Sequence, residues 1–402
     1  MIGTRRPRVL LGFAEAFAAI EAVWSLQSAG MDVIAFTRRG SRSAIRRMKG
    51  VTVVEVDAPE ENLSATGAAL LLTVSTMAPD AFLPLDDMSL WLSGQIELGR
   101  QIGLGDTVVV GPDLAGVEFA LDKAAQIDAA LEVGLDVPES VVFRGVADVR
   151  VDRWPVILKP SDAVMVVGNS LIRPAGRICA NQEELLAAKA ELRPGPIVRQ
   201  TLVRGVGEGL FGFVGPNGTV DLTAHRRVRM LNPHGSASSA CESIDVDPEL
   251  ASRVVALLER AHWRGLFMAE FLRDDNGTAW FMELNGRAWG SLALARLRGY
   301  EYPAWAVQSA LELPKSPEPP ERAPHLVARH LGREIAHLGF VLRGPQTEAT
   351  VTWPSRWGTI RDLLTVRKEH RLYNWSPRNP SVLATDTWHT LADLASSRRR
   401  HA

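Results

Sequence analysis

A short turn between two apolar runs constrains this chain more than any other feature. Asn276-Gly277 separates the apolar residues 266–272 from the apolar residues 278–284. Both residues of a two-residue hairpin turn take a positive φ, and Asn-Gly between apolar runs is the strongest short signal for such a turn. The sequence therefore predicts a β-hairpin in which Asp275 pairs with Thr278.

This register places two carboxylates opposite each other. Counting outward from the turn puts Glu270 across from Glu283, and strand alternation adds Asn285 and Arg287 to the same face. Like charges repel when their Cβ atoms are ~5 Å apart, so a divalent cation between them is one explanation. Two carboxylates and an amide oxygen suit Mg²⁺, which takes its other ligands from water and phosphate. The alternatives are a solvated hairpin face, or a four-residue loop that separates the acids.

The hairpin residues resemble a known family. Ala-Glu-Phe-Leu at residues 269–272 and Met-Glu-Leu-Asn-Gly-Arg at residues 282–287 resemble the metal-binding strands of the ATP-grasp superfamily. Trp-Gly-Ser at residues 289–291 is similar to the subgroup like the carbamoyl-phosphate-synthase large chain. The family usually has proline where this chain has Gly286, and we expect this change to loosen the turn. The resemblance implies Mg²⁺, with Mn²⁺ as an alternative, and its ligands would be Glu270, Glu283 and Asn285.

Composition limits the class of protein. The chain has 402 residues, enough for two or three domains, and its apolar content of 46% is ordinary for a soluble globular protein. A net charge of −1 gives no basic excess that would point to nucleic acid or a membrane. Cys179 and Cys241 are too far apart to indicate a disulfide framework or a zinc site. The start lacks a signal-peptide cleavage pattern, and no apolar run approaches the ~20 residues of a membrane span, so we expect a cytoplasmic protein.

Three regions follow one another along the chain. Residues 1–113 alternate strands with helices, which predicts a parallel, doubly wound (Rossmann-like) sheet in an α/β protein. Residues 114–312 are the ATP-grasp domain that the resemblance implies. Its subdomains would be residues 114–199, which include a lid at residues 161–174, and residues 200–312. Residues 313–402 hold a proline-rich linker and a tryptophan-rich end.

That last region has no recognised counterpart. An aromatic cluster of this kind packs a small subdomain, or a contact between copies such as a homodimer, more often than it stacks on a ligand. The tryptophans concerned are Trp353, Trp357, Trp375 and Trp388.

Two lysines indicate a phosphate site. Lys159 closes an apolar strand at residues 154–160, where an ammonium group is costly unless it finds water or an anion. Lys123 lies on a helix predicted over residues 114–133. Alone, each is more simply a surface lysine, but as a pair they resemble the ATP-grasp lysines that hold the nucleotide phosphates.

The resemblance also implies the rest of an ATP site. A hinge after residues 197–202 would meet the adenine, and Glu208 would hold the ribose, although an acid in a glycine-rich turn is the simpler alternative. Asp86 and Asp87 follow a strand of the first region, where such sheets place ligands, but helix-capping acids explain them equally well. The nucleotide contacts implied beside the lysines are Ile157, Gln200, Leu202, Glu208 and Leu272.

These residues imply a ligase. A substrate carboxylate would attack the γ-phosphate of ATP to give an acyl phosphate, and an amine would then displace phosphate to form an amide and leave ADP. Arg287 would orient the carboxylate, and Arg227 would stabilise the charge on the transferring phosphoryl group. The alternatives are a kinase that stops after phosphorylation and a nucleotide-binding regulatory protein without turnover. No signal in the sequence identifies the acid or the nucleophile.

Overall fold

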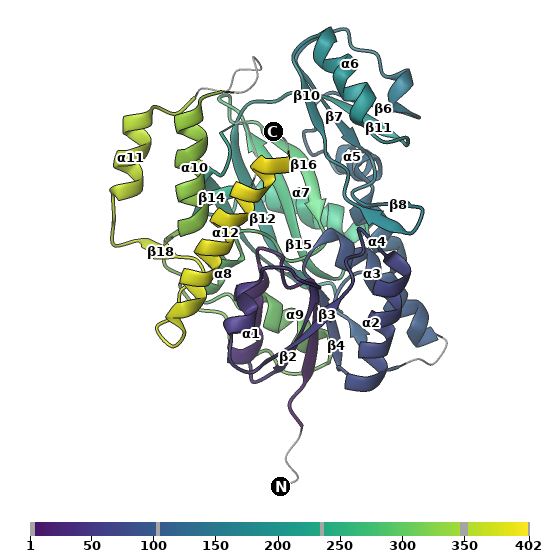
Figure 1. Ribbon diagram of the computed structural model, residues 1–402, viewed down its shortest axis with the longest axis vertical. Coiled ribbons are helices and arrows are strands. Elements are labelled where there is room, and N and C mark those ends of the chain that lie inside the picture. Colours follow the sequence, from purple (N-terminus) through teal and green to yellow (C-terminus); the bar gives the residue numbers. More distant parts are fainter. Residues whose placement is uncertain (1–4, 102–104, 234–236, 346–352, 401–402) are drawn as a thin grey trace.

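The N-terminal region forms the parallel sheet that its alternating pattern predicts. The computed structural model describes residues 5–101, 105–233, 237–345 and 353–400 (Figure 1). In spatial order the strands of this sheet are β3 (Val51–Val56), β2 (Asp32–Arg38), β1 (Arg8–Gly12), β4 (Ala81–Pro84) and β5 (Val108–Val109). The helices that connect them are α1 (Ala19–Ser28), the 3₁₀ helix η1 (Ala44–Arg47), α2 (Leu63–Met77) and α3 (Asp87–Gln101).

The segment predicted as one helix over residues 114–133 is two helices. Asp122 has extended backbone with φ −111° and ψ 105°, and it separates α4 (Leu114–Leu121) from α5 (Lys123–Glu132). Its carboxylate accepts hydrogen bonds from the backbone of Ala124 at 2.9 Å and from Ser161 Oγ at 2.6 Å. Lys123 therefore opens a helix instead of lying on the side of a longer one.

A four-stranded antiparallel sheet follows. Its strands, in spatial order, are β10 (Arg177–Cys179), β7 (Val156–Pro160), β11 (Ile197–Thr201) and β6 (Ser140–Phe143). The 3₁₀ helix η2 (Val146–Asp148) precedes β7, and α6 (Gln182–Glu191) covers one face through Leu185 and Ala188. The predicted lid is a small hairpin of β8 (Met165–Val167) and β9 (Ser170–Ile172).

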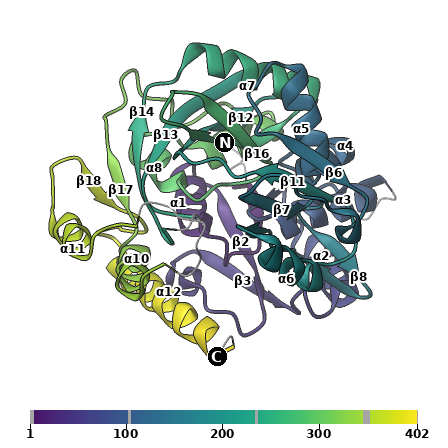
Figure 2. The same ribbon diagram turned by 90° about the horizontal axis from the view of Figure 1, so that it is seen from above.

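This lid hairpin rests on the N-terminal region. Asn169 at its turn accepts a hydrogen bond from the backbone of Ser64 at 3.0 Å, and the amide of Leu171 donates to the carbonyl of Pro59 at 2.7 Å. Figures 1 and 2 both draw β8 close to the N-terminal helices. The lid therefore spans the gap between the four-stranded sheet and the first region.

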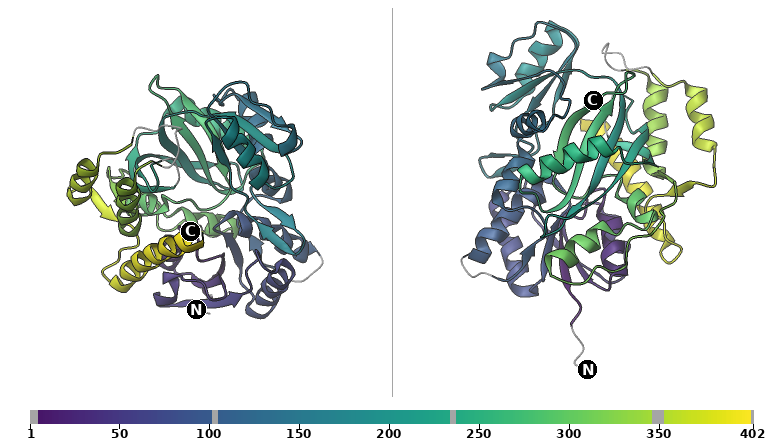
Figure 3. Two further views of the ribbon diagram at one scale, coloured as in Figure 1. Left: turned by 45° about the horizontal axis from the view of Figure 1, so that its top comes forward. Right: turned by 180° about the vertical axis from the view of Figure 1, so that it is seen from behind.

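The largest sheet carries the predicted hairpin. Its spatial order is β16 (Ala279–Asn285), β15 (Gly265–Arg273), β12 (Val206–Val214), β13 (Val220–Met230), β14 (Ser238–Ile244), β17 (Val327–Arg329) and β18 (His370–Leu372). Helix α7 (Pro248–Arg260) crosses one face (Figure 3, right). The other face meets the N-terminal region together with α8 (Leu292–Leu297) and α9 (Tyr302–Ala310).

The hairpin has the predicted acid pair but not the predicted turn. Arg273 pairs with Ala279, and the amide of Asp274 donates to the carbonyl of Thr278 at 3.0 Å, so the loop has three residues instead of two. This shifts the register by one residue. A β-bulge at Met282 shifts it back, and Glu270 is again directly across from Glu283.

The C-terminal region is joined to this sheet. β17 pairs with β14, β18 pairs with β17, and α10 (Leu331–Arg343), α11 (Arg356–Leu364) and α12 (Pro380–Arg400) complete the region. Three of its tryptophans do not pack a small subdomain, and the alternative, a contact between copies of the chain, stays a prediction. Trp357 is 81% exposed, Trp388 69% and Trp375 44%. No helix in the described ranges is long and apolar enough to cross a membrane.

Candidate active site

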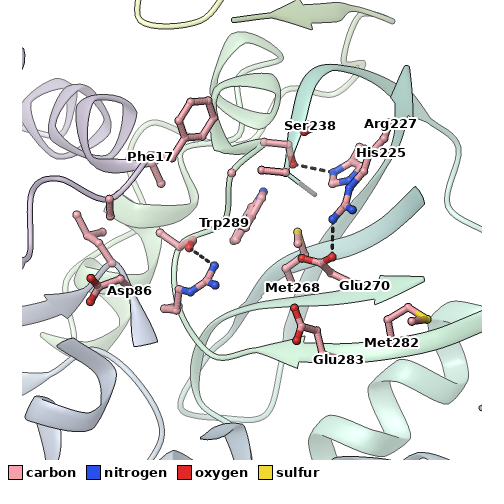
Figure 4. A pocket seen from close by; sticks show the side chains of 18 of the residues that line it. Phe17, Asp86, His225, Arg227, Ser238, Met268, Glu270, Met282, Glu283 and Trp289 are labelled. Atoms are coloured by element: carbon pink, nitrogen blue, oxygen red, sulfur yellow. Dashed lines mark hydrogen bonds and ion pairs between the residues drawn. The ribbon is translucent and has the colours of Figure 1, made fainter. Parts of the chain in front are cut away.

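A cavity of about 690 Å³ lies where the three regions meet. The loops after β1 and β4, with the last residue of β2, supply one wall, which is the carboxyl edge where parallel sheets bind ligands. The hairpin β15–β16 supplies a second wall, and Arg333 of α10 belongs to a third. Figure 4 shows Phe17 and Asp86 from the first wall facing Glu270 and Glu283 from the second, with Trp289 between them.

The two predicted acids have different partners. Glu270 forms an ion pair with Arg227 and accepts a hydrogen bond from Asn285 Nδ2 at 3.1 Å (Figure 4). Glu283 lines the cavity, and no hydrogen bond or ion pair holds it within the described part of the chain. Two opposed carboxylates beside an amide oxygen are the hard ligands that Mg²⁺ takes. The donor set therefore fits a divalent cation at Glu270, Glu283 and Asn285.

The two predicted lysines approach this acid pair. Burial lowers the pKa of Lys159 below its ordinary value, and the negative charge of Glu283 partly opposes that shift. The same two causes act, in the same order, on the pKa of Lys123. Lys159 Nζ donates to Gln200 Oε1 at 3.0 Å, and no carboxylate within the described ranges pairs with it. Lys159 lines the cavity with Glu270 and Glu283, and Lys123 lines an adjoining pocket with Glu283, whereas Gln200 is buried and contacts Lys159.

Of the apolar residues expected around adenine, Leu272 lines the cavity, whereas Ile157 and Leu202 are not among its lining residues. Ile157 pairs with Gln200 across the four-stranded sheet and shares the face of Lys159, because alternate residues of a strand point to one side. Leu272 shares the face of Glu270 in the same way and lines the cavity. Leu202 follows the end of β11 and is half-buried.

The structure does not bring Glu208 to this site. It lies in β12 directly across from Phe271, so its side chain points to the face opposite that of Glu270. It is 4% exposed and forms ion pairs with Arg226 at 3.0 Å and Arg273 at 2.7 Å. The glycine-rich segment expected to be a hinge loop is strand from Val206 onward, and this alternation carries Glu208 away from the cavity.

An ion-pair cluster connects the N-terminal region to the hairpin. Asp87 pairs with Arg287 at 2.9 Å and with Arg173 of the lid segment at 3.0 Å. Burial raises the pKa of Asp87, but the two arginines outweigh it and the pKa lies below its ordinary value. Asp86 instead caps α3 by accepting from the amide of Ser89 at 2.7 Å. Asp86 therefore has the capping role and also lines the cavity, whereas Asp87 is held in ion pairs, and a ligand role for either acid stays a prediction.

Sequence reasoning missed a buried histidine contact in the cavity wall. His225 is 2% exposed, and its Nδ1 lies 2.7 Å from Ser291 Oγ. Gly209 lies opposite His225 in the next strand, and a Cβ there would come within 3.0 Å of the imidazole. Burial, with a smaller contribution from Arg227, lowers the pKa of His225 to about 3.

Because His225 is buried, we expect the free energy of unfolding to depend on pH. The folded protein keeps His225 neutral, whereas the unfolded chain protonates it below its ordinary pKa of about 6.5. The stabilisation is present above pH ~6.5 and is lost as pH falls toward ~3, by at most about 1.4 kcal/mol per pH unit. Denaturant unfolding across this range should give a flatter profile for His225→Asn than for the exposed control His262→Asn. Equal slopes in the two variants would contradict the assignment.

The packing around Gly286 leaves no room for a side chain. A Cβ on this glycine would lie 2.5 Å from the ring of Trp263 and 3.0 Å from Ala120 Cβ, so the structure gives the glycine a reason other than a loose turn. We expect Gly286→Ala to destabilise the protein by about 1–3 kcal/mol through overpacking. Gly67→Ala in α2 is the control, because nothing lies within 4 Å of its Cβ and it should be neutral or stabilising. Chemical denaturation of both variants measures the difference, and equal stabilities would refute the packing argument.

Comparisons with known proteins identify the fold. No family model matches the sequence, and a search of the curated proteins gives no match. The L-amino acid ligase from Bacillus licheniformis superposes with a TM-score of 0.59 at 16% identity, over 78% of this chain and 75% of that one. Biotin carboxylase from Campylobacter jejuni gives 0.60 at 15% identity, over 80% and 75%. N5-carboxyaminoimidazole synthetase from Staphylococcus aureus gives 0.60 at 12% identity, over 80% and 81%.

These neighbours share the fold over about four-fifths of this chain. At such low identity the likeness concerns the fold alone. This chain has the fold of the ATP-grasp ligases.

Proposed function

We propose that this protein is an ATP-dependent carboxylate–amine ligase that forms an amide through an acyl phosphate. One observation carries the proposal: Glu270 and Glu283 face each other in a cavity that also receives Lys159 and Arg227. Opposed acids surrounded by cations suit a metal–triphosphate complex, in which the metal charge offsets the acids and the phosphate charge offsets the cations.

The nucleotide would lie between the four-stranded sheet and the hairpin. Ile157 and Leu272 provide apolar surface on the two sides, while Lys159 and Lys123 neutralise the phosphates. Phosphoryl transfer depends mainly on such positioning and charge stabilisation. Mg²⁺, when bound, supplies a Lewis acid at the γ-phosphate.

The chain's own residues would then govern the transfer. Arg227, held by Glu270, is positioned to stabilise charge on the transferring phosphoryl group. Arg287, held by Asp87, is positioned to orient the substrate carboxylate. The lid, which contacts the N-terminal region at Asn169, would keep water from the acyl phosphate. The incoming amine releases phosphate and gives the amide.

The printed descriptions of the structural neighbours support this class of reaction. They include an L-amino acid ligase and a synthetase, and one biotin carboxylase domain is described in complex with MgADP and bicarbonate. The complex with MgADP and bicarbonate agrees with a ligase that uses ATP and Mg²⁺ on small molecules.

ADP release tests the proposal. The full-length protein is incubated with ATP, Mg²⁺ and a panel of carboxylic acids, with and without an amine mixture. We expect ADP and phosphate only when both acid and amine are present, together with an amide adduct by mass spectrometry. A stable phosphorylated product formed from one compound alone would replace the ligase with a kinase. Binding of ATP without ADP formation under any condition would favour a regulatory protein.

A further inference from the structure

The C-terminal region reaches the cavity through one arginine. Arg333 lies in the first turn of α10, and its side chain lines the cavity. Its Nη1 donates to the carbonyl of Ser238 at 3.1 Å, and its Cζ lies 3.2 Å from the centre of the Phe17 ring. Stacking on an aromatic face and a hydrogen bond to the backbone together fix the guanidinium at the cavity wall.

The other cations of the cavity have partners or a proposed role. The ion pairs are those of Arg38 with Glu15, Glu60 and Asp86, of Arg227 with Glu270, and of both Arg173 and Arg287 with Asp87. Lys159 faces the proposed phosphate site. Arg333 is different, because among the residues that the structure describes no carboxylate oxygen lies within 4.0 Å of its guanidinium.

Asp386, the carboxylate of the C-terminal region whose charge acts on Arg333, is engaged elsewhere. Asp386 carboxylate lies 2.8 Å from His330 Nε2 and accepts a hydrogen bond from Asn374 Nδ2 at 2.9 Å. It interacts with Arg333 only as a more distant charge. A half-buried guanidinium is therefore left facing the cavity without a matching negative charge from the described chain.

The chemistry of Arg333 selects an anion. Burial lowers its pKa to about 10, so it stays charged at neutral pH. Its place in the first turn of α10 adds the partial positive charge of a helix N-terminus. One guanidinium matches a carboxylate in charge and fork geometry, whereas a phosphate carries a charge of about −2 and would leave part of it uncompensated.

We propose that Arg333 binds a substrate carboxylate that does not take part in the reaction. The proposal rests on the ligase function proposed above, in which the reacting carboxylate lies near Arg287 and the metal ligands. Figure 4 shows Phe17 and Ser238, the two contacts of Arg333, well separated from Glu283. Two sources have this chemistry: a dicarboxylic acid as the donor, or an amino acid as the amine acceptor.

Matched ligands distinguish these sources. Thermal-shift titrations of the full-length protein compare the common amino acids with their carboxamides, and short dicarboxylic acids with their monomethyl esters. A comparison of phosphoethanolamine with ethanolamine tests whether the site binds a phosphate instead. Mg²⁺ with ATP is titrated separately. The variants are Arg333→Met, Arg333→Lys and the exposed control Arg343→Met on the same helix.

We expect the wild type and Arg343→Met to bind the carboxylates of at least one series about tenfold or more tightly than the matching carboxamides or esters. The reason is that the uncharged ligands lose the charged hydrogen bond to Arg333. Arg333→Met should bind both members of each pair alike, and Arg333→Lys should retain part of the preference. A preference among the dicarboxylic acids identifies the ligand as the acid donor, and a preference among the amino acids identifies it as the amine acceptor.

Three results would overturn the proposal: a preference that survives in Arg333→Met, no preference in the wild type, or a preference for phosphoethanolamine alone. The Mg²⁺–ATP titration reports on the proposed nucleotide site separately. If ATP fails to stabilise the wild type while Arg333→Met still abolishes a carboxylate preference, the ligase function fails and the carboxylate site stands.

Discussion

Replacing Glu283 with glutamine is expected to reduce ADP formation by about 10³-fold while the protein stays folded. Glutamine keeps the volume of the side chain and removes its charge. Within the described chain no ion pair occupies Glu283, so its carboxylate is available to a cation in a way that Glu270, which is paired with Arg227, is not. Loss of one anionic ligand weakens the metal and the charge stabilisation that it supplies to the transferring phosphoryl group.

The matched control is Glu249→Gln on α7. Its side chain is 77% exposed and, among the described residues, forms an ion pair only with Arg253 one helical turn away, so ADP formation should be unchanged. Steady-state ADP release at several Mg²⁺ concentrations measures both variants. Partial rescue of Glu283→Gln by high Mg²⁺ would agree with a ligand role. Wild-type turnover in Glu283→Gln would remove the metal assignment.

Lys159→Met should abolish stabilisation by ATP without destabilising the free protein. Burial lowers the pKa of Lys159, and within the described residues it has a hydrogen bond to Gln200 but no carboxylate partner. A buried ammonium in this situation costs stability in the absence of an anion, and methionine keeps the apolar stem. The free variant should therefore melt at the same temperature as the wild type or above it. With ATP, the affinity should fall by about 10²-fold or more.

These opposite effects separate a phosphate-binding lysine from a structural one. The control is Lys49→Met, because Lys49 is exposed and remote from the cavity walls. Thermal melting with and without ATP and Mg²⁺ measures both variants. If Lys159→Met lowers the melting temperature of the free protein and keeps the wild-type response to ATP, Lys159 has a structural role and the phosphate assignment is wrong.

The β15–β16 hairpin shows which features the sequence pattern predicted and which it did not. The acid pair Glu270–Glu283 was predicted from a two-residue loop, and the structure has that pair with a three-residue loop and a bulge at Met282. The apolar and polar alternation of each strand is strong enough to fix which residues face the cavity. The turn length and the bulge depend on local backbone geometry, and their two one-residue shifts cancel.

Glu208 shows where prediction from the sequence pattern fails. Its glycine-rich surroundings resembled a loop, but Gly207 and Gly209 belong to β12 and leave room for Arg227 and His225 on the facing strand. A Cβ on Gly207 would lie 2.5 Å from Arg227 Cδ. A glycine that makes space for a neighbour cannot be told from a glycine in a turn until the neighbouring strand is known.

The sequence by itself determined the fold class, the parallel N-terminal sheet and the face that Glu283 shares with Asn285, because these follow from the periodicity of side chains along single elements. Only the tertiary structure decided the break at Asp122, the pairing of Asp87 with Arg287, and the position of Arg333 in the cavity wall. Each of these depends on contacts between segments far apart in the chain. No local pattern encodes such contacts, since they form only when the separate sheets and helices pack together.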